Sequence, residues 1–250
     1  MPFFKTLHTT VFALICMSLI CITLATSATA QSTHDHDHDH DHDDHSASES
    51  SEQISPLPAM VGAFSQLDSD HVLGSPVAPV SMIIYASVTC PHCSSWFTSI
   101  WPDIKKNYIE TNKLSVVFRE FPTQPANIAV IGFQIANCAP EDQYFSIIEH
   151  QMIEQSNIFA SLNAGTGKDT YLAIAKKAGL ADEAAMNTCI QSQAGYDRIN
   201  KSMSLAGAAG IKSVPHFIIN GEIYKGGQDF LPLAKHLDEA INLGYSPVLQ

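Results

Sequence analysis

Two short apolar runs near the middle of the chain have the pattern of buried β-strands. Val80–Ala86 and Leu114–Phe121 are almost continuously apolar and end at turn-forming residues, as expected of strands that are covered on both faces. Between them, apolar side chains recur at helical spacing, which predicts a helix over about residues 94–108. Pro102 falls inside this helix and should kink or divide it. The order strand, helix, strand predicts a parallel βαβ unit.

The pattern after the second strand changes to helices and returns to strands near the C-terminus. Further helices are expected over residues 126–138, 144–155, 171–178 and 183–193. Asn220-Gly221 predicts a tight hairpin turn, and Val214-Pro215 stands directly before the first strand of that hairpin. A last amphipathic helix is expected over Phe230–Leu243. This mixture of strands and helices places the protein in the α/β class.

The N-terminus has the features of a secretory signal peptide. Lys5 precedes an apolar segment at residues 11–24, and Ala28-Thr29-Ala30 offers a small-residue cleavage site before Gln31. We expect residues 1–30 to be removed on export. An uncleaved membrane anchor is the alternative, although the apolar segment is short for one.

A low-complexity segment follows the predicted signal peptide. Residues 34–45 read HDHDHDHDHDDH, and residues 31–56 as a whole are expected to form a disordered linker because they have few apolar side chains to bury. Imidazoles next to carboxylates suit zinc, copper or nickel. Weak metal binding by this segment and a merely solvated linker stay open as alternatives. The candidate metal ligands are His34, His36, His38, His40, His42 and His45.

Charge and composition describe one main domain with an acidic tail. The formal net charge is −12, but from Leu57 onward 17 acidic residues face 12 Lys and Arg residues, so that this part has a net charge of −5. Hydrophobic residues make up 45% of the chain, which is enough for a sizeable core. The predicted domain spans residues 57–250. No basic patch is present in the sequence, and a nucleic-acid-binding function is not indicated.

The candidate chemistry is concentrated at Cys90-Pro91-His92-Cys93. A CxxC motif between a strand and a helix is typical of a thioredoxin-like redox site. Its first cysteine stands where the unpaired N–H groups of the helix favour the reactive thiolate, and Cys93 is close enough to form a disulfide with it. Zinc is the alternative, but the sequence has no second CxxC to complete a four-ligand site.

The other cysteines and one charged pair leave further alternatives open. Removal of the signal peptide leaves Cys138 and Cys189 outside the motif. They are either a second disulfide, which would contribute roughly 4 kcal/mol in the chain-entropy model, or two separate buried thiols.

Arg119-Glu120 interrupts the second strand. Either one of them lies beneath the thiols, where a carboxylate can relay protons, or the two form a surface ion pair.

Taken together, these motifs resemble the DsbA-like thiol–disulfide oxidoreductases of the thioredoxin superfamily. The resemblance rests on the CPHC motif at Cys90–Cys93, on Val214-Pro215, on the Asn220-Gly221 hairpin and on Phe118–Pro122, and it covers about residues 57–250. It implies a thioredoxin fold with an inserted helical domain at about residues 125–207. It also implies that Pro215 is a cis-proline facing the CxxC, and that the backbone of Val214 pairs with an extended substrate chain.

The same resemblance implies a periplasmic enzyme that introduces disulfide bonds into reduced or unfolded exported proteins. Cys90, Pro91, His92, Cys93 and Pro215 are the expected catalytic residues, with His92 stabilising the Cys90 thiolate. No cofactor is expected beyond the thiols, and a membrane quinone-linked partner is expected to reoxidise them. A monomer is expected because the linker is too simple to be a dimerisation domain. The alternatives are a disulfide reductase or isomerase, and a metal-binding envelope protein that uses its tail.

Overall fold

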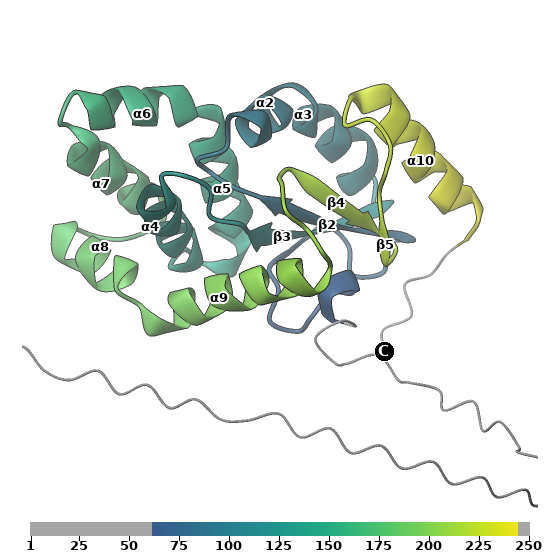
Figure 1. Cartoon of the computed structure of the whole chain (residues 1–250), viewed down its shortest axis with the longest axis horizontal. Coiled ribbons are helices and arrows are strands. Elements are labelled where there is room, and N and C mark those ends of the chain that lie inside the picture. The colour runs from purple at the N-terminus through teal and green to yellow at the C-terminus, as the bar shows by residue number, and fades with distance from the viewer. Residues whose placement is uncertain (1–61, 245–250) are drawn as a thin grey trace, which may run out of the picture. The chain divides into compact units, whose positions relative to one another are not determined.

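A five-stranded sheet forms the centre of the structure, a computed structural model that describes residues 62–244. The strand order is β1-β3-β2-β4-β5 (Figure 1). The central strands β2 and β3 are parallel, as predicted, and every other neighbouring pair is antiparallel. The strands are β1 (Val72–Leu73), β2 (Val80–Ala86), β3 (Leu114–Glu120), β4 (His216–Ile219) and β5 (Glu222–Ile223).

Helices cover both faces of the sheet, which explains why β2 is apolar except at Ser81. Successive side chains of a strand point to opposite faces. Met82 and Ile84 therefore belong to the larger buried cluster, whereas Ile83 and Tyr85 belong to a second cluster that includes Leu205 of helix α9 (Gln193–Ala208). The prediction that both faces of β2 are covered is confirmed.

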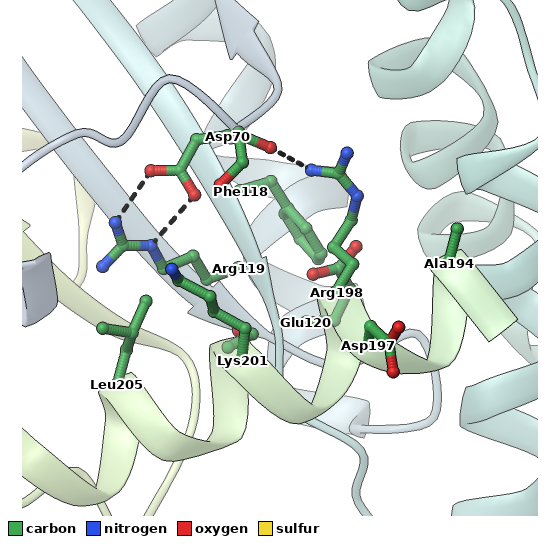
Figure 2. Close-up of a pocket in the computed structure, with 11 residues that line it drawn as sticks. Asp70, Phe118, Arg119, Glu120, Ala194, Asp197, Arg198, Lys201 and Leu205 are labelled. Atoms are coloured by element: carbon green, nitrogen blue, oxygen red, sulfur yellow. Dashed lines mark hydrogen bonds and ion pairs between the residues drawn. The ribbon is translucent and has the colours of Figure 1, made fainter. Parts of the chain in front are cut away.

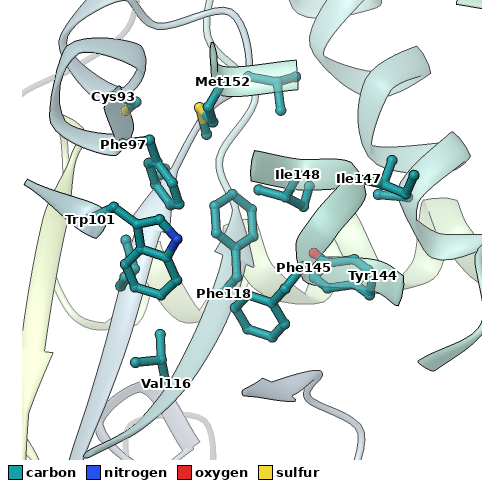
Figure 3. Close-up of a cluster of buried hydrophobic side chains, with 14 of the residues drawn as sticks. Cys93, Phe97, Trp101, Val116, Phe118, Tyr144, Phe145, Ile147, Ile148 and Met152 are labelled. Carbon is teal, nitrogen blue, oxygen red and sulfur yellow. The ribbon is translucent and has the colours of Figure 1, made fainter. Parts of the chain in front are cut away.

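The helical segment after the CxxC motif is divided as Pro102 predicts. It consists of α2 (Pro91–Ser99), α3 (Trp101–Ile104) and a π-helical turn, η1 (Lys105–Ile109). Its buried side chains pack against the sheet together with the C-terminal helix α10 (Phe230–Asn242). Figure 3 shows Phe97 and Trp101 of this segment beside Phe118 of β3, with Phe97 also close to Met152 of helix α5 (Tyr144–Ile153). This aromatic packing joins the motif-bearing helix to the sheet.

An inserted helical domain lies between β3 and β4, which confirms the expected fold class. The predicted helix over residues 144–155 is divided at Glu154, because a second helix starts at Gln155. A long helix after residue 192 was not predicted as a separate element. The insertion comprises α4 (Ala126–Asn137), the 3₁₀ turn η2 (Glu141–Gln143), α5 (Tyr144–Ile153), α6 (Gln155–Asn163), α7 (Gly167–Lys177), α8 (Glu183–Ile190) and α9 (Gln193–Ala208).

The hairpin between β4 and β5 has the predicted turn. Asn220 and Gly221 both have positive φ angles, 49° and 84°, which is the requirement of a type I′ turn. The Asn220 side chain accepts a hydrogen bond from the Ser81 N–H at 2.9 Å, and the Asn220 N–H donates to the Ser81 carbonyl at 3.0 Å. The turn residue therefore also holds the hairpin to β2.

Several predictions fall on residues 1–61 and 245–250, which lie outside the described part of the chain. They are the signal peptide at residues 1–30, the linker at residues 31–56 and the six histidines that are candidate metal ligands. Between residues 62 and 244, no helix has the length and apolar character needed to cross a bilayer.

Candidate active site

The CxxC motif lies at the start of α2, directly after the carboxyl end of β2. Cys90 is the N-cap residue with an extended backbone (φ −87°, ψ 120°), and Pro91 follows it at the first helical positions. Proline suits this position because its fixed φ is helical and its missing N–H has no role there. No side chain caps the helix, so its first N–H groups remain available to the Cys90 sulfur.

The two thiols of the motif have different environments. Both are free thiols, and Cys90 is 7% exposed whereas Cys93 is 0% exposed. A hydrogen bond from the Cys93 thiol, with smaller contributions from the N–H groups of Cys93 and His92 and from the charge of His92, lowers the pKa of Cys90 to about 6. Burial, and then the hydrogen bond to Cys90, raises the pKa of Cys93 far above its ordinary value. Cys90 is therefore the nucleophilic thiolate near neutral pH, while Cys93 keeps its proton.

The loop before β4 faces Cys90. The Val214–Pro215 peptide bond is cis, and the Cys90 sulfur lies 3.5 Å from the Val214 carbonyl oxygen. The Gln228 side chain donates to the Pro215 carbonyl at 2.9 Å, and the Gln228 carbonyl accepts from the Trp96 indole N–H at 3.0 Å. These bonds hold the cis-proline loop against the motif-bearing helix.

A glutamine from the inserted domain contacts the other side of the motif. Gln155 is the first residue of α6 and is buried. Its side-chain amide donates to the carbonyls of Val88 at 2.8 Å and of Cys90 at 3.1 Å. It thus satisfies two carbonyl groups that the loop before α2 presents, and it couples the insertion to the redox site. No motif in the sequence points to this residue.

Buried hydroxyl groups position the loop that precedes Cys90. Thr89 Oγ1 lies 3.0 Å from Ser87 Oγ and 2.9 Å from Thr123 Oγ1, and the Thr123 N–H donates to Ser87 Oγ at 3.2 Å. Thr123 follows β3, so this network joins the ends of the two central strands. Sequence reasoning did not identify these residues, because isolated Ser and Thr residues have no distinctive spacing.

The charged pair at the end of β3 is buried. A surface ion pair is wrong, because Arg119 and Glu120 are 1% and 2% exposed. Arg119 instead binds Asp70, with 2.7 Å between Nη2 and Oδ2. Glu120 accepts a hydrogen bond from the Tyr144 hydroxyl at 2.9 Å. Burial raises the pKa of Glu120, and the described groups that interact with it do not include either thiol, so the proton-relay interpretation gains no support.

The remaining cysteines form the second disulfide. Cys138 and Cys189 are bonded to each other, and they connect the end of α4 to α8 within the inserted domain. The alternative of two separate thiols is therefore wrong. This bridge closes a loop within the insertion and leaves the CxxC pair free to react.

The described residues contain no group of three or more His, Cys, Asp or Glu side chains arranged to hold a metal ion. Cys90 and Cys93 thus lack the further ligands that a structural zinc site requires. The six histidines at residues 34–45, which are the other candidate metal ligands, lie outside the described residues 62–244.

Comparison with known proteins agrees with this site. The family model described as Thioredoxin matches residues 66–239. A curated relative from Rickettsia conorii, provisionally named a protein-disulfide oxidoreductase, is 27% identical over 199 residues, covering 78% of this chain and 69% of that protein. Wolbachia pipientis α-DsbA1 is similar in structure, with 28% identity, a TM-score of 0.63, and coverage of 72% of this chain and 94% of that chain. BdbD from Bacillus subtilis shares the fold at 17% identity and a TM-score of 0.58, over 69% of this chain and 93% of that chain.

A CxxC motif at a helix start, with a cis-proline loop against its first cysteine, defines a thiol–disulfide oxidoreductase on a thioredoxin fold. The chain belongs to the thioredoxin family. Within that superfamily it is a DsbA-like protein-disulfide oxidoreductase. The resemblance inferred from the sequence is confirmed.

Proposed function

We propose that this oxidoreductase works as an oxidase, which donates the Cys90–Cys93 disulfide to reduced exported proteins. A substrate thiolate attacks the sulfur of Cys90, the disulfide breaks, and Cys93 leaves with the electron pair and takes up a proton. A second substrate thiolate then attacks the substrate sulfur of the mixed disulfide. The substrate disulfide forms and Cys90 is released as a thiolate.

The contrast between the two thiols is the observation that carries this proposal. A stabilised Cys90 thiolate favours the reduced enzyme, and an enzyme with a stable reduced form is a strong oxidant of its substrates. The low pKa of Cys90 also makes its thiolate a good leaving group when the oxidised product is released. The carbonyl of Val214, 3.5 Å from the Cys90 sulfur, lies where the backbone of an extended substrate can pair with the cis-proline loop.

The deciding experiment is the equilibrium redox potential of Cys90–Cys93 measured against glutathione. We expect a value well above the roughly −270 mV of thioredoxin. A potential close to that of thioredoxin would overturn the oxidase proposal and favour a reductase.

His92→Ala should lower the redox potential because the charge of His92 helps to lower the pKa of Cys90. His236→Ala, a matched change on α10, should leave the potential unchanged. An isomerase would be distinguished by its ability to reshuffle a scrambled substrate without added oxidant.

The compartment and partners follow from the same proposal. We place the enzyme in the periplasm, since its N-terminal segment has a signal-peptide pattern and the Cys138–Cys189 disulfide suits an oxidising compartment. We propose a monomer because the low-complexity segment before residue 57 does not resemble a dimerisation domain. Each catalytic cycle leaves two electrons on the enzyme, which a membrane quinone-linked partner would remove.

The histidines at residues 34–45 would bind zinc, copper or nickel weakly. Deletion of residues 34–45 should leave the biological role of the protein intact, and Cys90→Ala should abolish that role. The reverse result would favour a metal-binding protein.

A further inference from the structure

A cavity of about 300 Å³ lies between helix α9, the end of β3 and the segment before β1 (Figure 2). It is lined by none of the residues of the redox motif or the cis-proline loop. Its volume is at the lower end of the range for small-molecule sites. Phe118 and Leu205 supply apolar walls, and Glu120, Arg198, Lys201 and Ser202 supply polar groups.

One of these polar groups lacks the partner that burial normally demands. Ser202 is 3% exposed, and its hydroxyl has no hydrogen-bond partner among the described residues. Buried hydroxyl groups are nearly always hydrogen-bonded, because an unpaired one loses its contact with water without compensation. A ligand oxygen in the cavity would supply the missing partner.

Two cations at the cavity, Arg198 and Lys201, have no ion-pair partner among the described residues. Arg119 and Asp70 pair with each other, and Asp197 accepts a hydrogen bond from Gln193 at 2.8 Å. Figure 2 shows Arg198 and Lys201 projecting from α9 on the side of Asp70. Arg198 donates one hydrogen bond to the Ser69 carbonyl, and in the described part of the chain no ion pair involves Lys201. The cavity therefore presents two cations to a ligand.

A buried carboxyl group also lines the cavity. Glu120 accepts a hydrogen bond from the Tyr144 hydroxyl at 2.9 Å, and Arg198 from α9 and His71 from the segment before β1 also face it. Burial raises the pKa of Glu120. Hydrogen-bond donors on Ser202, Arg198 and Lys201 line the same cavity and can surround one anionic group.

We propose that this cavity binds a small monocarboxylate, with its carboxylate between Arg198, Lys201 and Ser202 and its hydrocarbon chain against Phe118 and Leu205. Arg198 and Lys201 supply the positive charge that a carboxylate requires, although Asp197 and Glu120 line the same cavity. Inorganic phosphate would add charge without a group to occupy the apolar walls. This site is separate from the CxxC motif. Binding at it does not depend on whether the enzyme works as an oxidase or a reductase.

The test is titration of butanoate into the purified oxidised protein, followed by calorimetry and by NMR shifts of residues in α9. We expect saturable binding, weakened at least about tenfold by Lys201→Met, since the loss of a charge-assisted hydrogen bond has about this effect. Ser202→Ala should also weaken it. Lys106→Met, which removes an exposed lysine from η1, should have no effect. Absence of saturable binding, tighter binding of inorganic phosphate, or an equal loss with Lys106→Met would each overturn the proposal.

Discussion

Ionisation of Cys90 near pH 6 is the most direct prediction from the structure. The reduced protein should form a thiolate with a midpoint near the pKa of about 6. The Cys93 thiol is the largest cause of this low value, so Cys93→Ala should move the midpoint upward. Cys90→Ala should lack this ionisation step, because Cys93 is buried and its pKa is raised.

The effect on redox chemistry can be worked from the same pKa. An ordinary cysteine, with a pKa of about 8.5, is about 3% ionised at pH 7, whereas a pKa of about 6 makes Cys90 about nine-tenths thiolate. The difference stabilises the reduced enzyme at pH 7 by about 1.4 kcal/mol, which corresponds to about 30 mV for a two-electron couple. The pKa of Cys90 in the folded enzyme is lower than that of an ordinary cysteine. The stabilisation of the reduced enzyme therefore reaches its full value above about pH 8.5 and is lost as the pH falls through about 6.

Three measurements check this reasoning. The ultraviolet absorbance of the thiolate and the rate of alkylation by iodoacetamide should both rise with a midpoint near pH 6. The redox potential should fall by about 60 mV per pH unit below this midpoint and by about 30 mV above it, because reduction then takes up one proton rather than two. A wild-type midpoint above about pH 7.5, or one that Cys93→Ala does not change, would refute the argument.

Three further variants should have a lower free energy of unfolding, measured by urea denaturation. Gln155→Ala leaves the Val88 carbonyl without this donor and removes one of the two hydrogen bonds to the Cys90 carbonyl, at a cost of about 1–3 kcal/mol. Replacing Cys138 and Cys189 by Ala opens a bridge with a sequence separation of 51; it should cost about 4 kcal/mol and leave exchange at the CxxC motif intact. Arg119→Met leaves Asp70 without its ion-pair partner, and breaking such a buried pair costs about 3–5 kcal/mol.

Matched controls separate these effects from general sensitivity to substitution. Gln193→Ala removes a glutamine that bonds only on an exposed helix surface, and it should change stability little. Lys235→Met breaks an exposed i,i+4 pair with Glu239 and should also have a small effect. Stability losses in the controls that equal those of Gln155→Ala or Arg119→Met would contradict the roles assigned to these residues. Loss of exchange activity in the doubly substituted cysteine variant would contradict the separation of the two cysteine pairs.

The redox motif could be predicted from the sequence because its chemistry is local. Cys90 and Cys93 are one helical turn apart, and the apolar strand before them indicates where the helix begins. The hairpin at Asn220-Gly221 is local in the same way, since both residues adopt the positive φ angles that the turn requires. The role of Pro215 came from the resemblance, because a single proline does not reveal which loop it faces.

Other parts of the fold could not be predicted because their local signal is weak or absent. Helix α9 was not recognised as a separate element; it has polar residues along much of its length, and only a few of its side chains are buried. Gln155 and Gln228 are ordinary polar residues in the sequence. They acquire their roles only because the chain brings them to carbonyl groups of the motif and of the cis-proline loop.

By itself, the sequence determined every strand except the short edge strand β1, most helices, the redox motif and its family, because periodicity, turn chemistry and the CxxC spacing act over a few residues. Tertiary structure decided which groups meet. It paired Cys138 with Cys189, buried Arg119 against Asp70, and brought the Val214 carbonyl to Cys90 across a sequence separation of 124. The physical reason is that a buried polar group must find a partner wherever the packed chain supplies one, and sequence spacing does not reveal where that is.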